Sequence, residues 1–204
     1  MVRHYQHWAR RQSRTSASSS RQYSGSRFCG TGDPNRCRPV QGDLLAKAVA
    51  LDLALRPATR SDRAFIERLA QAALMAYGSY DRYLIGYLEE EGVSTCVGLL
   101  EDEPVGFYML TDYEHPEGRG SLADLLAIAV NPEHQSRGIG RQLLRGAIDE
   151  SGAMESSPRE ICLFVAEGNS RGQRLFARHS FRFRGGVGIY PAGQRALSMV
   201  KTLS

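Results

Sequence analysis

Residues 131–144 read NPEHQSRGIGRQLL and place two glycines, Gly138 and Gly140, between an apolar run and a helical pattern. The apolar run is SLADLLAIAV, residues 121–130, and it is typical of a strand that is buried on both faces. After the glycines, apolar residues recur at the spacing of one helix face. These residues are Ile139, Leu143, Leu144, Ala147 and Ile148.

A strand that passes through a glycine-rich turn into a helix predicts an anion site. The first turn of the helix offers unpaired N–H groups and the positive end of its dipole, which stabilise a phosphate. Gly138 and Gly140 allow close approach to the backbone, and Arg137 and Arg141 add positive charge. A tight strand-to-helix turn without a ligand is the alternative interpretation.

The stretch fits one of three phosphate-binding patterns. A P-loop has four residues between its glycines, followed by Lys and then Ser or Thr, and this sequence does not supply them. A dinucleotide fingerprint requires a small residue where Leu143 stands. The third pattern is Q/R-x-x-G-x-G/A after a strand that ends in V-x-P. Residues 135–140, QSRGIG, match it behind Val130 and Pro132.

The rest of the chain predicts strands and helices in the order β-α-α-β-β-β-α-β-α-β-β. Periodicity and turn residues place a strand at 51–58, helices at 64–77 and 80–92, and a hairpin at 94–112. After the glycine helix they place a strand at 160–166, a helix at 169–180, and strands near 188–190 and 196–203.

With these motifs in this order, the sequence resembles the GNAT superfamily of acetyl-CoA-dependent N-acetyltransferases over residues 53–204. Beside the core motif at 125–144, EGNSRGQRLFARHSF (167–181) is similar to the family's N-x-R-A-x-x-L-Y-x-x-x-G-F segment. GIYPAGQRALSMVKTL (188–203) is similar to its closing segment. The resemblance implies a GNAT domain over 44–204 with an α+β (α/β three-layer) fold. Its central sheet would be mixed and mostly antiparallel, with about seven strands flanked by helices.

The resemblance also implies where acetyl-CoA binds. The backbone of Ile128, Ala129 and Val130 would pair with the pantetheine arm, like an added strand. Asn169 would contact the coenzyme, or it would serve only as the N-cap of the next helix. The pyrophosphate would be held by Gln135, Ser136, Arg137, Gly138, Ile139, Gly140 and Arg141.

The chemistry requires a base, because an alkylammonium has a pKa of about 10.4 and must lose a proton before it attacks. Asp124 is the candidate: it lies six residues before Val130, and strand alternation predicts that both share a face. The Val130 N–H would donate to the oxyanion. The family's proton-donating tyrosine is replaced by Phe176, so Tyr190 is the candidate acid. The alternatives are a solvated Asp124 at the strand start and a half-buried structural Tyr190.

The predicted function is transfer of an acetyl group to a primary amine of a small molecule, peptide or protein by direct attack in a ternary complex. Two other classes remain open. One is a non-catalytic acyl-CoA-binding or sensing module, which the loss of tyrosine at Phe176 favours. The other is a nucleic-acid-associated protein that acts through its basic N-terminal segment. Nucleic acid is the less expected partner, and a homodimer is compatible with the family.

Charge and composition distinguish the N-terminal segment from the rest of the chain. Residues 1–43 carry a net charge of +6, and the remainder carries −2. This Ser- and Arg-rich extension has no apolar periodicity and is predicted to be disordered. It could be a nucleic-acid arm, a transit peptide or a segment without function.

No apolar run is long enough for a membrane span. The spacing of the four cysteines suggests neither a metal site nor a disulfide framework, so a cytoplasmic location is expected.

Overall fold

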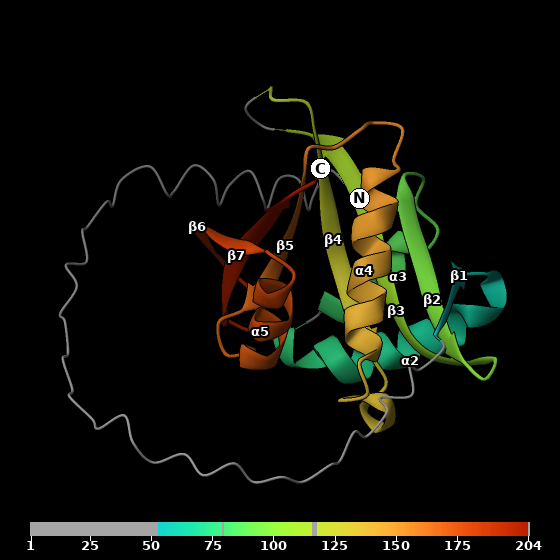
Figure 1. The fold of residues 1–204 in the computed structure, drawn as a ribbon. Coiled ribbons are helices and arrows are strands. Elements are labelled where there is room, and N and C mark those ends of the chain that lie inside the picture. The colour runs from blue at the N-terminus through green and yellow to red at the C-terminus, as the bar shows by residue number, and fades with distance from the viewer. Residues whose placement is uncertain (1–52, 79, 116–117, 204) are drawn as a thin grey trace, which may run out of the picture.

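A computed structural model of the chain describes residues 53–78, 80–115 and 118–203. The predicted N-terminal extension, residues 1–43, lies outside these described residues. The order of strands and helices is the order that the sequence predicts (Figure 1). The helices are α2 (Arg63–Leu74), α3 (Tyr80–Tyr87), α4 (Ile139–Gly152) and α5 (Ser170–Arg178). The strands are β1 (Ala54–Pro57), β2 (Val93–Leu100), β3 (Glu103–Glu114), β4 (Ser121–Val130), β5 (Glu160–Ala166), β6 (Arg182–Ile189) and β7 (Arg195–Thr202).

Seven strands form one mixed sheet in the order β1-β2-β3-β4-β5-β7-β6. The β4–β5 pair is parallel, and every other neighbouring pair in this sheet is antiparallel. The predicted mixed sheet of about seven strands is therefore confirmed.

Helix α3 ends at Tyr87 and not at Gly92, because three glutamates follow Leu88 and offer no apolar side chain to bury.

Helices cover both faces of the sheet and make three layers. Helices α4 and α5 pack on one face, where Leu143, Leu144 and Phe176 belong to the same buried core. Helices α2 and α3 pack on the other face through Ile66 and Leu84. Figure 1 shows α4 running along β3 and β4.

Strand β4 contains a β-bulge at its middle. Met109 of β3 pairs with Ala127, but the next β3 residue, Leu110, pairs with Leu125. Leu126 is therefore an extra residue on β4, and the direction of the side chains shifts there by one position.

The bulge changes the face on which Asp124 lies. Ala123 and Leu125 belong to the core beneath α4 and α5, so Asp124 between them points to the opposite face, the face of α2 and α3. Val130 packs against the α4 side. The prediction that Asp124 and Val130 share a face is therefore wrong, because strict alternation does not survive an inserted residue.

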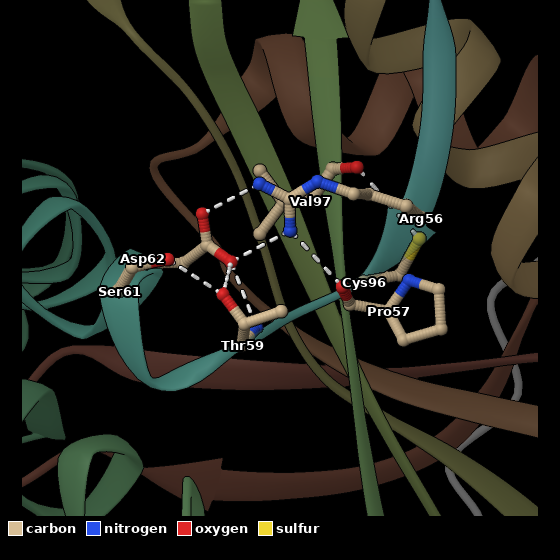
Figure 2. Close-up of polar contacts among 7 residues, drawn as sticks. All are labelled: Arg56, Pro57, Thr59, Ser61, Asp62, Cys96 and Val97. Carbon is tan, nitrogen blue, oxygen red and sulfur yellow. Dashed lines mark hydrogen bonds and ion pairs between the residues drawn. The ribbon is translucent and has the colours of Figure 1, made fainter.

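An ion pair with a buried carboxylate and a partly exposed guanidinium joins β1 to the start of α2 (Figure 2). The guanidinium of Arg56 donates two hydrogen bonds to the carboxylate of Asp62, at 2.7 and 2.8 Å. The backbone N–H and the hydroxyl of Thr59 donate to the same carboxylate, at 2.7 and 2.8 Å. Asp62 is 5% exposed. These donors, Arg56 first, hold the pKa of Asp62 well below its usual range, although burial opposes them.

We expect Asp62→Asn to lower the free energy of unfolding at pH 7 by about 2 kcal/mol, because it breaks a charge-assisted pair at a buried site. The depressed pKa means that this stabilisation is present above the unfolded-state pKa of about 4 and is lost as pH falls below it. Urea unfolding at pH 7 and at pH values below 4 measures both effects.

The matched control is Glu67→Gln, which breaks an exposed pair with Arg63 (2.7 Å) and should change stability by no more than about 0.5 kcal/mol. Equal losses in Asp62→Asn and Glu67→Gln, or a loss that does not shrink at low pH, would contradict this account.

Candidate active site

The two parallel strands pair over only part of their length. Their register runs from Leu122–Glu160 to Leu125–Leu163. Beyond that point β5 continues beside β7, and within the described residues no strand pairs with the β5 side of residues 126–130. We call this opening the fork, with β4 residues 126–130 as one arm and β5 residues 164–166 as the other.

The backbone groups of Ile128 and Val130 point into the fork. The N–H of Asn131 donates to the carbonyl of Val105 at 2.8 Å, so it points toward β3. Successive residues of a strand direct their N–H and C=O groups to opposite sides. Ala129 therefore faces β3, while Ile128 and Val130 face the fork. Of the three residues predicted to pair with pantetheine, Ile128 and Val130 direct their backbone N–H and C=O groups into the fork.

The glycine loop lies between the end of β4 and α4. Ser136 and Gly138 both have left-handed backbone, with φ of 66° and 88°. Among the described residues, no acceptor is recorded for the backbone N–H groups of residues 136–140. A Cβ at Gly138 would meet only the Arg141 guanidinium, at 4.0 Å, so the space in front of this glycine is open. The loop thus has the open, donor-rich form that an anion requires.

Gly140 locates the loop at the mouth of the fork. A Cβ there would lie 3.6 Å from both Val130 and Leu175. The start of α4 therefore packs between the end of β4 and helix α5.

Arg171 contacts this loop from α5, a role that the sequence alone did not predict. Its guanidinium donates to Gln135 Oε1 at 2.6 Å and to Ser136 Oγ at 3.3 Å. Gln135 in turn donates through Nε2 to the carbonyl of Val130 at 3.1 Å. Arg171 is the third residue of the matched N-x-R segment, and that position was the one available signal. The contact adds a cation beside the loop that is predicted to hold pyrophosphate.

Asn169 is the N-cap of α5. Its Oδ1 accepts a hydrogen bond from the N–H of Gly172 at 2.8 Å, and its own N–H donates to the carbonyl of Ala166 at 2.9 Å. Asn169 therefore follows the β5 arm of the fork directly. Its contact with coenzyme stays a prediction.

Asp124 lies at the apex of the fork, where β4 and β5 make their last pairs. Its side chain is fully buried, and neither carboxylate oxygen has a hydrogen-bond partner among the described residues. Burial raises the pKa of Asp124 to about 7, and its neighbour Cys162 opposes this rise. The alternative of a solvated Asp124 at the strand start is therefore wrong.

Tyr190 lies beside the β5 arm of the fork. It is 6% exposed, belongs to a small core with Ala166, and has the ring of Tyr77 at 4.9 Å between centroids. Burial, followed by Tyr77 and Asp124, raises the pKa of Tyr190, so its hydroxyl is protonated at neutral pH. Phe176 is buried in the core beneath α4, on the other side of the sheet from Asp124.

The β6–β7 turn contacts a short helical segment on the Tyr190 side of the sheet. The side chain of Gln194 donates to the carbonyl of Ala76 at 2.5 Å, and the N–H of Ala192 donates to the carbonyl of Tyr77 at 3.3 Å. The β6–β7 turn therefore rests on the short 3₁₀ helix Met75–Tyr77 that precedes α3. This contact fixes the stacked tyrosines beside the fork.

A family model described as Acetyltransferase (GNAT) family matches residues 58–181, the part of the chain that contains the fork, the glycine loop and Asp124. The chain belongs to the GNAT acetyltransferase family. Members of this family use acetyl-CoA as the acetyl donor, and the open backbone of β4 beside a donor-rich loop suits that co-substrate. The predicted enzyme class is confirmed.

Solved structures support the fold. Arabidopsis thaliana NAA60 in complex with acetyl-CoA is 18% identical, with a TM-score of 0.61, covering 74% of this chain and 98% of that one. The ribosomal-protein-S18-alanine N-acetyltransferase of Escherichia coli is 19% identical, with a TM-score of 0.60 and coverage of 74% and 94%. A mutant form of the SpeG spermidine N-acetyltransferase of Vibrio cholerae is 21% identical, with a TM-score of 0.58 and the same coverage.

A comparison with curated protein sequences gave no match. Within the described residues, no helix is long and apolar enough to cross a membrane. In the same part of the chain, no three His, Cys, Asp or Glu side chains are grouped as metal ligands would be.

We expect Gly138→Val to weaken acetyl-CoA binding by more than about tenfold, because its side chain would enter the open space before the loop amides and its backbone would leave the left-handed region. Isothermal titration calorimetry measures the affinity, and a thermal melt confirms the fold. Gly152→Ala is the control, because Gly152 is the last residue of α4, its Cβ would meet no other atom, and the affinity should stay nearly unchanged. Equal affinity in folded Gly138→Val would contradict the phosphate-binding role of the loop.

Proposed function

We propose that the protein transfers the acetyl group of acetyl-CoA directly to a primary amine in a ternary complex, with Asp124 as the general base and Tyr190 as the general acid. The observation that carries the proposal is the buried, unpartnered carboxylate at the apex of the fork. A base with a pKa of about 7 is half ionised at neutral pH and suits proton transfer from an ammonium.

Acetyl-CoA supplies the acetyl group as a thioester. Ile128 and Val130 would hold its pantetheine arm through their backbone groups, and Gly138, Ile139 and Gly140 would donate N–H groups to its pyrophosphate. Arg171 and Arg141 would add positive charge there. Gln135, Ser136 and Arg137 complete the loop, and the N-cap Asn169 would approach the arm from β5.

The residues of the site divide the proton transfers. Asp124 takes one proton from the bound ammonium, so that the neutral nitrogen can attack the carbonyl carbon. The Val130 N–H donates to the oxygen on which negative charge develops. Tyr190 donates a proton to the departing thiolate and recovers one from the nitrogen as the amide forms. One proton in total goes to solvent, from Asp124.

The two described cysteines favour direct transfer over an acyl-enzyme. A cysteine nucleophile must be a thiolate. Cys96 and Cys162 are both buried, and burial raises the pKa of each thiol, which keeps them protonated. Neither described cysteine is therefore a good nucleophile, and the amine of the acceptor is expected to attack the thioester itself.

The acceptor class is part of the same proposal. Solved relatives carry the names of a ribosomal-protein-S18-alanine and a spermidine N-acetyltransferase, so peptide amines and polyamines are the first candidates. A thiol-release assay with acetyl-CoA and a panel of amines tests activity and acceptor class together. The panel would hold an Ala-starting peptide, a lysine peptide, spermidine and an aminoglycoside.

A cytoplasmic, homodimeric enzyme is the remaining part of the proposal. Two buried free thiols suit a reducing compartment. The edge strand β6 exposes Phe183 (58%) and Ile189 (56%), apolar side chains that a second copy could cover. Light scattering of the purified protein decides the assembly state.

We expect Asp124→Asn to lower kcat by at least about 10²-fold and to change the pH profile. In the natural protein, kcat/KM should rise with a limb near pH 7. In Asp124→Asn this limb should move toward the pKa of the amine, about 10 for an alkylamine, because only the neutral amine then reacts. Steady-state kinetics from pH 5 to 10 measure both effects, and an unmoved limb would rule out Asp124 as the base.

We expect Tyr190→Phe to lower kcat by about 10²-fold with little effect on acetyl-CoA affinity, because it removes only the proton donor. Tyr77→Phe is the matched control: it keeps both stacked rings and should keep kcat. If Tyr190→Phe changes KM for the amine and leaves kcat unaltered, the thiolate departs without help from this hydroxyl.

A further inference from the structure

Two polar residues near Asp124 have no role in the proposed mechanism. Cys162 on β5 is the direct register partner of Asp124, so the two side chains point to the same face of neighbouring strands. The hydroxyl of Tyr113, on β3, lies 3.7 Å from the sulfur of Cys162. All three side chains are held on the central strands of the sheet, where backbone pairing fixes their positions.

The hydrogen-bonding capacity of these groups gives the contact a direction. An ionised carboxylate only accepts, so the one proton of the Cys162 thiol is best placed toward Asp124. The sulfur then remains as an acceptor, and the Tyr113 hydroxyl must be the donor of the 3.7 Å contact. When Asp124 is ionised, the line of hydrogen bonds would run from Tyr113 O–H to the Cys162 sulfur, and from Cys162 S–H to the carboxylate.

We propose that Cys162 and Tyr113 are positioning residues for Asp124: Tyr113 orients the thiol, and the thiol stabilises the ionised carboxylate at the apex of the fork. In the structure neither carboxylate oxygen of Asp124 has a hydrogen bond among the described residues, so the neighbouring thiol is the donor that the ionised carboxylate can recruit. The weak S–H donor therefore leaves the carboxylate basic, where a strong donor such as a guanidinium would remove its basicity.

Titratable groups reach Asp124 from each neighbouring element. Tyr87 comes from α3, Tyr113 from β3, Cys162 from β5 and Tyr190 from the β6–β7 turn, and each interacts electrostatically with the carboxylate. Burial raises the pKa of all four, so all are neutral when Asp124 titrates. Farther out, Arg184 of β6 is paired with Glu160 at 2.9 Å and favours ionisation of Cys162 and Tyr113.

This inference rests on the proposed role of Asp124 as the general base. Its test has two readouts, and one of them does not depend on that role. The first readout is the acidic limb of kcat/KM against pH. Cys162→Ala should move this limb up by about half a pH unit to one unit, the size expected for the loss of one modest hydrogen bond. Cys162→Ser keeps a donor and should return the limb to its natural position or below it. Tyr113→Phe should move it in the same direction as Cys162→Ala. Cys96→Ala removes the other buried thiol, which lies in the α4-side core, and should leave the limb in place.

The second readout is the pH dependence of the free energy of unfolding. The raised pKa of Asp124 means that the folded protein binds its proton more tightly than the unfolded chain. Stability should therefore fall as pH rises from about 4 to about 7, and this slope should be absent in Asp124→Asn. In Cys162→Ala the falling range should extend to higher pH.

The two readouts separate the ways in which the account can fail. If Cys162→Ala extends the stability slope but the kinetic limb does not depend on Asp124, the positioning role stands and the base role is overturned. If the natural limb depends on Asp124 but Cys162→Ala and Cys162→Ser leave both readouts unchanged, the positioning role is overturned. A shift in Cys96→Ala as large as that in Cys162→Ala overturns it as well.

Discussion

The structure depends on the point at which β4 and β5 stop pairing. Parallel pairing carries both strands as far as Leu125 and Leu163, where the fork begins. Backbone N–H and C=O groups require partners, and on this edge the Val130 carbonyl already accepts a hydrogen bond from Gln135. A ligand with amide groups could satisfy the remaining groups. The pantetheine arm of acetyl-CoA has such groups and can take the place of the missing strand. In the proposed mechanism the same opening locates the proton transfer, because Asp124 lies at its apex.

Two buried aspartates show how the fold handles a carboxylate for opposite purposes. Asp62 receives four hydrogen bonds, from Arg56 and Thr59, and its pKa is depressed. It joins β1 to α2 and contributes to stability. Asp124 is fully buried and has no such donor, so burial raises its pKa to about 7. Its ionisation costs stability near neutral pH, and the cost is consistent with a residue that is kept for proton transfer.

The sequence predicted the parts of the site that are local in the chain. Gly138 and Gly140 stand within a strand-loop-helix unit, and the pattern QSRGIG behind Val130 and Pro132 predicted the anion loop. The N-cap at Asn169 was readable for the same reason. The order of strands and helices along the chain was predicted by a continuous set of motifs.

Other features depend on pairing between distant segments and could not be read locally. The bulge at Leu126 is defined by the register of β3 against β4, so alternation placed Asp124 on the wrong face. Arg171 reaches Gln135 across the space between α5 and the loop. Cys162 becomes a neighbour of Asp124 only through parallel pairing.

We propose that the fork holds the thioester with its carbonyl oxygen at the Val130 N–H. A crystal structure with acetyl-CoA tests it directly. We expect the pantetheine arm along residues 128–130, the carbonyl oxygen about 2.7–3.1 Å from the Val130 nitrogen, and the carbonyl carbon facing Asp124. Pantetheine bound outside the fork, or an acetyl group out of hydrogen-bonding reach of Val130, would contradict it.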